Sequence, residues 1–101
     1  MRLAFALVLI AATSCKPAPG VHEVTIRNFR FEPGTVSVAT GDTVRWRNAD
    51  LLPHTASASN RAWDSGSLSA GAVWQVPFPE SGTYPYQCDA HPTMRGVVVV
   101  K

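Results

Sequence analysis

Three residues with metal-binding side chains follow one another at intervals of three near the C-terminus: Cys88, His91 and Met94. One short loop with this spacing can wrap a thiolate, an imidazole and a thioether around a single ion. Two sulfur donors, one of them a thioether, favour a soft ion, and the imidazole beside them points to copper before zinc, calcium or magnesium. The loop therefore predicts a copper site.

A fourth donor stands far upstream of this loop. His54 follows Pro53 after the loop residues Leu51 and Leu52, where a neighbouring strand can begin at the same end of a β-structure. With His54 added, the donors are two imidazoles, one thiolate and a weak axial thioether, which is the ligand composition of a blue-copper electron-transfer site. Such a set leaves no open position for a substrate, so it predicts an electron carrier and not an enzyme.

Each of these residues has a plainer interpretation when it is taken alone. A buried thiol is often inert, and a methionine often fills space in a core. The metal site is favoured because Cys88, His91 and Met94 share one loop spacing and follow an upstream Pro-His pair. His22 opens a predicted strand with no sulfur or second histidine near it in the sequence, so we interpret it as a surface residue.

The N-terminus has the layout of an export signal. In residues 1–14 a positive charge precedes an apolar run and then small residues, and the run is shorter than the roughly 20 apolar residues of a membrane-spanning helix. Cys15 stands where bacterial lipoproteins carry their lipidated cysteine, so we expect cleavage before it and a lipid on it. Ordinary cleavage between Ser14 and Gly20 is the alternative. Either way, the signal predicts export to the periplasm or cell envelope.

The rest of the chain divides into a tether and one domain. Residues 15–21 include a Pro-rich segment that we expect to form a flexible tether, and residues 22–101 form the domain. Exported domains normally pair their cysteines. Because Cys15 is assigned to the lipid, Cys88 has no partner for a disulfide, which is consistent with a metal-binding thiolate.

From residue 22 onward, short β-rich runs alternate with turn signals. The runs are 22–31, 35–39, 43–48, 54–58, 72–78, 83–88 and 96–101. The apolar alternation changes phase near Asn28, where we expect a β-bulge. The final run is continuously apolar, as in a central strand, and Pro77 and Pro79 mark an edge. Six or seven short strands predict an all-β, two-sheet antiparallel sandwich.

Composition excludes several other classes. A chain of 101 residues is one domain. Its nine Lys and Arg residues are scattered and its net charge is only +2, so there is no basic stripe for a nucleic acid. Eight prolines and seven glycines, spread along the chain, argue against a helical bundle. A hydrophobic content of 46% supplies a core and argues against disorder.

Several segments resemble those of a known family. They are Phe31-Glu32-Pro33-Gly34, Gly41-Asp42-Thr43-Val44-Arg45-Trp46-Arg47-Asn48, Pro53-His54, Gly82-Thr83-Tyr84-Pro85-Tyr86-Gln87-Cys88 and His91-Pro92-Thr93-Met94-Arg95-Gly96. From His22 onward, nearly all of the chain resembles cupredoxins of the plastocyanin and amicyanin type, and the short ligand loop followed by Arg-Gly is more similar to amicyanin. The resemblance implies a Greek-key β-sandwich with one type 1 copper. It also implies that His54, Cys88 and His91 are the equatorial ligands and that Met94 is the axial one.

Two positions beside the ligands depart from the family pattern. Members usually carry Asn after the first histidine and Ser or Thr after the cysteine, and these side chains tie the ligand loops together. Here the positions hold Thr55 and Asp89, and we expect a hydrogen bond between the Thr55 hydroxyl and the Asp89 carboxylate to replace that tie. Asn48 is the third residue expected beside the ligands.

The expected function is electron transfer by one copper that cycles between Cu(I) and Cu(II). The expected donor and acceptor are redox proteins, such as a cytochrome c, a dehydrogenase or an oxidase. They would meet the exposed edge of His91 through an apolar docking patch, which consists of Leu51, Leu52, Pro53, Ala90 and Pro92. We expect a monomer that binds no nucleic acid and reaches a membrane only through its lipid. An envelope copper-delivery protein and a metal-free sandwich that binds a partner protein are the alternatives.

Overall fold

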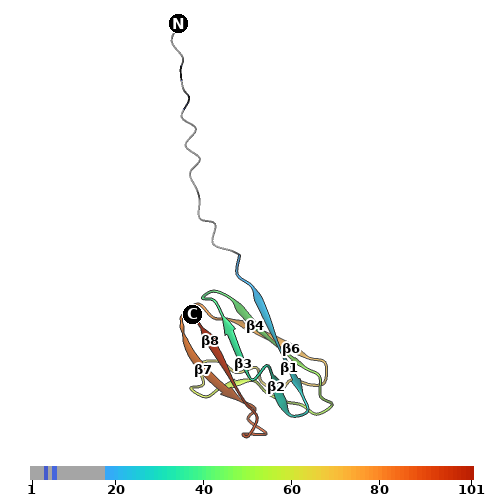
Figure 1. The fold of residues 1–101 in the computed structure, drawn as a ribbon. Helices are drawn as coiled ribbons and strands as arrows, with labels where there is room; N and C mark the ends of the chain where they lie inside the picture. Colours follow the sequence, from blue (N-terminus) through green and yellow to red (C-terminus); the bar gives the residue numbers. More distant parts are fainter. Residues whose placement is uncertain (1–3, 5, 7–17) are drawn as a thin grey trace.

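The computed structural model describes residues 4, 6 and 18–101, so the predicted lipidation site Cys15 and most of the signal segment lie outside the described residues. The described part forms eight strands in two layers (Figure 1). They are β1 (Val21–Arg27), β2 (Arg30–Glu32), β3 (Thr35–Val38), β4 (Thr43–Asn48), β5 (Ser57–Ala58), β6 (Val73–Pro77), β7 (Gly82–Gln87) and β8 (Arg95–Val100). Within these residues no helix has the length and apolarity needed to cross a bilayer.

The strands form two four-stranded sheets, with the orders β2-β1-β4-β6 and β3-β8-β7-β5. This confirms the predicted two-sheet sandwich, with β8 inside its sheet and β6 at an edge. The expectation of purely antiparallel sheets is wrong, because β1 pairs with β4 and β3 pairs with β8 in parallel. The chain leaves the first sheet after β2, forms β3 in the second and returns as β4 beside β1. No hairpin joins the two parallel neighbours, so nothing forces them to run in opposite directions.

The expected bulge at Asn28 is instead a tight hairpin turn. Strands β1 and β2 are antiparallel, with Ile26 opposite Phe31, and two residues join them. Asn28 and Phe29 have φ angles of 53° and 58°, as in the two-residue turns that match the strand twist. The turn explains the phase change, because the opposed Ile26 and Phe31 both point into the core. It also leaves Phe29 at the tip with 44% of its surface exposed.

An aromatic cluster fills the core beneath the strand that leads to Cys88. Trp46 on β4 is fully buried, and its ring centroid lies 5.2 to 5.7 Å from those of Trp63, Trp74 and Tyr86. Tyr86 lies on β7, two residues before the equally buried Cys88. Close packing of large rings restricts movement, so the core fixes the backbone that presents the thiol.

Gly96 makes room for one ring of this cluster. It lies opposite Tyr86 in the β7–β8 register, and a Cβ atom at this position would overlap the Tyr86 ring. We therefore expect Gly96→Ala to lower the free energy of unfolding by about 1–3 kcal/mol, as overpacking does. Chemical denaturation of the apo domain measures this. Gly34→Ala is the control, because a Cβ there meets only the Phe31 carbonyl oxygen at 3.8 Å. Equal stabilities for the two variants would contradict the packing argument.

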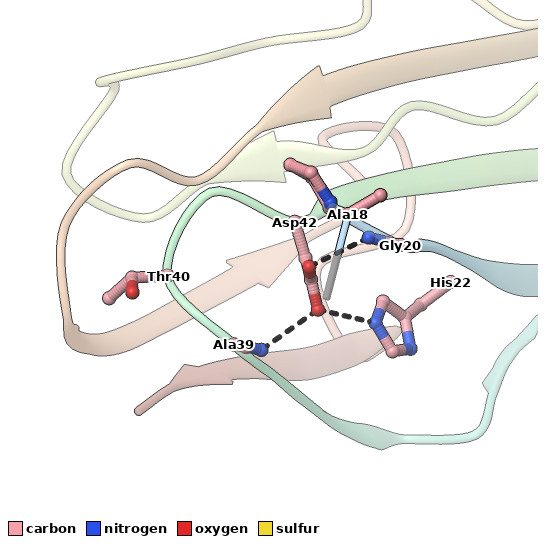
Figure 2. Close-up of a pocket in the computed structure, with 7 residues that line it drawn as sticks. Ala18, Gly20, His22, Ala39, Thr40 and Asp42 are labelled. Atoms are coloured by element: carbon pink, nitrogen blue, oxygen red, sulfur yellow. Dashed lines mark hydrogen bonds and ion pairs between the residues drawn. The ribbon is translucent and has the colours of Figure 1, made fainter. Parts of the chain in front are cut away.

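A hollow of about 450 Å³ lies around Asp42, where β1 and β4 begin. The Asp42 carboxylate accepts hydrogen bonds from the N–H groups of Gly20 at 2.8 Å and Ala39 at 3.0 Å, and pairs with the His22 ring at 2.8 Å (Figure 2). His22, interpreted as a surface residue, has 37% of its side chain exposed and is also bonded to Asp42. The N–H groups of Gly20 and Ala39, followed by the His22 ring, lower the pKa of Asp42 from 3.8 to about 2. The carboxylate fastens the start of β1 to the sandwich.

The lowered pKa gives a pH-dependent prediction. Because the folded state holds Asp42 ionised, its stabilising contribution is present above pH 4 and is lost as the pH falls towards 2. We expect Asp42→Asn to lower the thermal midpoint at neutral pH, by a difference that shrinks below pH 4. Calorimetry of both proteins between pH 2 and pH 7 measures this. Glu80→Gln removes an exposed carboxylate as a control, and a difference independent of pH would be the contrary result.

Candidate metal centre

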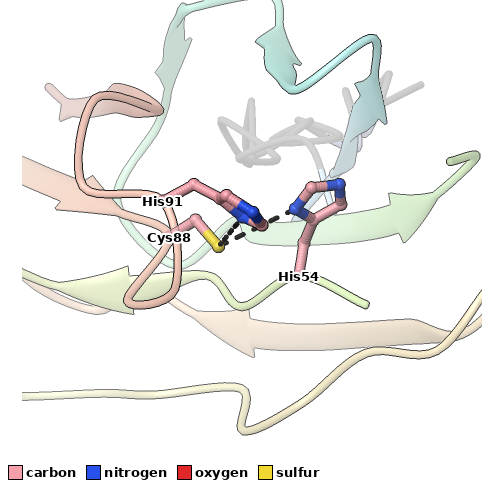
Figure 3. A group of neighbouring side chains, drawn as sticks. All are labelled: His54, Cys88 and His91. Atoms are coloured by element: carbon pink, nitrogen blue, oxygen red, sulfur yellow. Dashed lines mark hydrogen bonds between the residues drawn. The ribbon is translucent and has the colours of Figure 1, made fainter. Parts of the chain in front are cut away.

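The structure brings three of the predicted donors into one cluster. The Nδ1 atoms of His54 and His91 lie 3.8 and 3.7 Å from the Cys88 sulfur (Figure 3), and the three donor atoms all lie within 4.8 Å of one another. His54 and Cys88 are buried, whereas His91 is partly exposed. Cys88 forms no disulfide among the described residues. The cluster is therefore closed on its inner side and reaches solvent only through His91.

These separations fit a single bound metal ion. With metal–nitrogen and metal–sulfur bonds of about 2.0 and 2.3 Å, an ion at the centre of a trigonal plane leaves about 3.7 Å between nitrogen and sulfur. Both measured Nδ1–Sγ distances agree with this value. Imidazole and thiolate donors together, with a thioether near them in the chain, favour copper. The side chains present thus fit a type 1 copper.

The short loop between β7 and β8 carries three of the four predicted ligands. Its backbone closes on itself: the Cys88 N–H donates to the Met94 carbonyl at 3.1 Å, and the N–H groups of His91 and Met94 donate to the carbonyls of Cys88 and His91. The Arg95 side chain donates to the Pro92 carbonyl at 3.2 Å. Met94, the predicted axial ligand, is 4% exposed. The loop therefore holds its donors in one compact turn.

The fourth donor is held by a different part of the chain. His54 forms a two-way backbone bridge with Leu68, at 3.1 and 2.7 Å. The predicted neighbour Asn48, fully buried at the end of β4, donates to the carbonyls of Leu52 and Leu68 and accepts the Asp50 N–H. Asn48 thus supports the loop that leads to His54.

The tie between the two ligand loops differs from the expected one. Thr55 does connect them, because its hydroxyl accepts the backbone N–H of Asp89 at 2.9 Å and its own N–H donates to the Cys88 sulfur at 3.3 Å. The expected hydroxyl–carboxylate bond is wrong. The Asp89 carboxylate turns to Arg61 and Ser57, and the Arg61 guanidinium lowers the pKa of Asp89. The Arg61 guanidinium thus pairs with this charge.

Asp50 is a residue beside the predicted ligands that the sequence analysis missed. Its carboxylate lies 2.9 Å from Nε2 of His54. A carboxylate only accepts, so Nε2 carries the proton and Nδ1 keeps its lone pair for a metal. Burial opposes ionisation, but the N–H groups of Phe29 and Asn28 and the His54 ring outweigh it and hold the pKa of Asp50 below its ordinary value. An acidic residue four positions before the predicted ligand was the available signal.

The docking patch residues are all exposed, as the prediction requires. Leu51 is 93% and Leu52 53% exposed, and the patch residues Pro53, Ala90 and Pro92 are exposed as well. Phe29, whose side chain the expected bulge at Asn28 would have turned into the core, joins this surface. Together with Leu51 and Leu52 it lines a hollow of about 400 Å³, and its ring contacts those of His54 and His91. The apolar surface thus adjoins both imidazoles.

Comparison with known proteins agrees with this geometry. A cupredoxin-like domain family matches residues 1–100. Amicyanin of Paracoccus denitrificans is 35% identical over 94 residues, which span 83% of this chain and 68% of the relative. Amicyanin-alpha of Methylorubrum extorquens is 32% identical over 102 residues, which span 95% of this chain and 86% of the relative. The solved Cu(I) form of a methionine-to-alanine amicyanin variant superposes with a TM-score of 0.75 at 34% identity, covering 83% of this chain and 85% of that one. This chain belongs to the cupredoxin-like family.

Proposed function

We propose that this protein carries single electrons on one type 1 copper held by His54, Cys88, His91 and Met94. The observation that carries the proposal is the pair of Nδ1–Sγ distances, 3.8 and 3.7 Å, which match two imidazoles and a thiolate around one ion. When bound, the copper supplies a one-electron couple between Cu(I) and Cu(II). Three strong donors and an axial thioether leave no coordination position for a substrate, which favours a carrier over an enzyme.

The chain contributes a ligand frame that is set before the metal binds. Asp50 fixes the protonated nitrogen of His54, and Asn48 holds the loop that precedes it. The Thr55 N–H points at the Cys88 sulfur, where a hydrogen bond tunes the reduction potential of a thiolate site. Because these contacts are already formed without a metal, the ligands need to move little when an electron enters or leaves.

The exposed face indicates how electrons enter and leave. His91 is the one partly exposed donor of the three-residue cluster, and the docking patch together with Phe29 lies at the same end. An apolar surface of this kind suits a transient redox partner, such as a cytochrome c, a dehydrogenase or an oxidase. The domain then acts as a monomer that passes electrons between two proteins.

We place this carrier in the periplasm or cell envelope, anchored by a lipid on Cys15. The apolar run before Cys15 and the Pro-rich tether after it support this. Mass spectrometry of the native protein tests the anchor. A diacylated chain that begins at Cys15 is the expected species, and an unmodified chain that begins after Cys15 would contradict the assignment.

Reversible redox cycling tests the carrier function. The copper-loaded protein should lose its visible absorption on addition of one electron equivalent of reductant and regain it with oxidant, without consuming dioxygen. A copper-delivery protein, the second candidate, would instead surrender its ion to a moderate chelator within minutes. Loss of copper on each cycle would contradict the carrier and favour delivery.

A further inference from the structure

The Phe29 ring packs against both predicted histidine ligands. Its centroid lies 5.0 Å from the His54 ring and 5.0 Å from the His91 ring, with interplanar angles of 88° and 89°. The two imidazoles lie 5.2 Å apart. These are the distances and the edge-to-face angles at which aromatic rings attract one another. Each of the three rings thus packs against the other two, although Phe29 lies in the β1–β2 turn, far from both histidines in the sequence.

The backbone holds Phe29 in a conformation that few such residues adopt. Its φ of 58° lies in the left-handed region, which is uncommon for residues other than glycine and marks a position fixed by its surroundings. The Asp50 carboxylate accepts the N–H groups of Asn28 at 2.7 Å and Phe29 at 2.9 Å. The same carboxylate holds His54, so one side chain sets both the turn and a ligand.

The two histidines differ in how they are otherwise restrained. His54 is buried, bonded to Asp50 and bridged to Leu68. The His91 ring is partly exposed, and within residues 18–101 its one hydrogen-bonding contact is the Cys88 sulfur. The His91 ring is thus held by aromatic packing against two neighbours, the buried His54 ring and the Phe29 ring.

We propose that Phe29 is a positioning residue for electron transfer: its ring holds the His91 imidazole in the metal-binding orientation. This inference rests on the proposed function, because it concerns how still the ligand stays when the oxidation state changes. A ring free to rotate would add to the motion that accompanies each electron transfer and would slow it.

Nuclear magnetic resonance of the apo domain tests the contact itself. We expect nuclear Overhauser effects from the Phe29 ring protons to both imidazoles, and a His91 ring whose relaxation matches that of the backbone. Absence of these effects, or a His91 ring that rotates freely in the wild-type domain, would overturn the proposal. This measurement needs no metal, so it separates failure of the inference from failure of the copper assignment.

Three variants test the consequence for electron transfer. Phe29→Leu keeps an apolar side chain but removes the ring, Phe29→Tyr keeps the ring, and Val73→Ala is the control because Val73 is similarly exposed, at 42%, on β6. In the copper protein, we expect Phe29→Leu to lower the electron self-exchange rate by about threefold to tenfold, the factor that one aromatic pair is worth. It should also loosen the His91 ring.

The tyrosine variant distinguishes positioning from a general surface effect. Phe29→Tyr should retain the wild-type rate and a rigid His91 ring, and Val73→Ala should change neither. An unchanged rate and ring in Phe29→Leu would overturn the proposal. Equal losses in the leucine and tyrosine variants would do so too, since they would assign the effect to the composition of the docking face.

Discussion

Replacing Cys88 by serine is expected to abolish the intense visible band of the copper-loaded protein completely. The band arises from charge transfer between a thiolate and copper, and a serine hydroxyl is neither soft nor ionised at neutral pH. The domain should still fold, because Cys88 forms no disulfide among the described residues and serine is no larger. Burying a hydroxyl in place of the thiol costs about 1–3 kcal/mol, which circular dichroism and thermal unfolding can follow beside the absorption spectrum.

The second cysteine of the chain supplies the matched control. Cys15→Ser removes a sulfur that we place outside the metal site, so it should leave the band intact when the domain is loaded with copper in vitro. A blue Cys88→Ser protein would contradict the ligand assignment. Loss of the band in the Cys15 variant alone would show that Cys15, and not Cys88, supplies the thiolate.

Replacing Asp50 by asparagine is expected to weaken copper binding by about 10- to 100-fold, the range found when partners of metal-bound histidines are removed. The carboxylate fixes the protonated nitrogen of His54 and accepts two N–H groups of the Asn28–Phe29 turn. An amide has one accepting oxygen, so its NH₂ group must face at least one of these donors. Loss of the negative charge should also favour Cu(I) and raise the reduction potential. Competition with a copper chelator and voltammetry measure the two effects.

Glu32→Gln is the control for charge alone. Glu32 lies on β2, in the hairpin whose turn Asp50 holds, and pairs with Arg27 at 3.6 Å, with 45% of its side chain exposed. Its replacement removes the same charge but touches no predicted ligand, so affinity and potential should stay near the wild-type values. Equal changes in both variants would show that Asp50 acts only through the overall charge.

The ligand loop could be predicted from the sequence because its geometry is local. Cys88, His91 and Met94 lie within seven consecutive residues, and any tight turn between two strands brings them together. The addition of His54 needed only the expectation that two loops lie at one end of a sandwich. The exposure of Leu51 and Leu52 followed from their place in the loop that precedes His54.

What the sequence missed depends on contacts between distant segments. Phe29 reaches the site because two residues turn the chain, whereas a bulge would have kept its side chain in the core. Asp50 acts through the hairpin tip and through His54, and sequence spacing alone does not bring these segments together. The hydrogen bond between the two ligand loops also uses other atoms than expected. The Thr55 hydroxyl accepts from the backbone N–H of Asp89, while the Asp89 carboxylate binds Arg61 from a third segment.

Strand directions were the weakest part of the fold prediction. Alternation of apolar residues shows which face of a strand is buried. It carries no information about the direction in which the neighbouring strand runs. The pairs β1–β4 and β3–β8 are parallel because the chain changes sheets between β2 and β3 and again before β4. The prediction of a sandwich does not depend on this point, since the same residues can be buried whether neighbouring strands are parallel or antiparallel.

Titration of the apo domain with Cu(II), followed by visible and electron paramagnetic resonance spectroscopy, tests the copper centre most directly. One equivalent should produce an intense visible band and a spectrum with the small parallel hyperfine splitting of a copper–thiolate site, and further copper should add neither. A colourless complex with the large splitting of ordinary Cu(II), or no binding at one equivalent, would contradict the proposed centre.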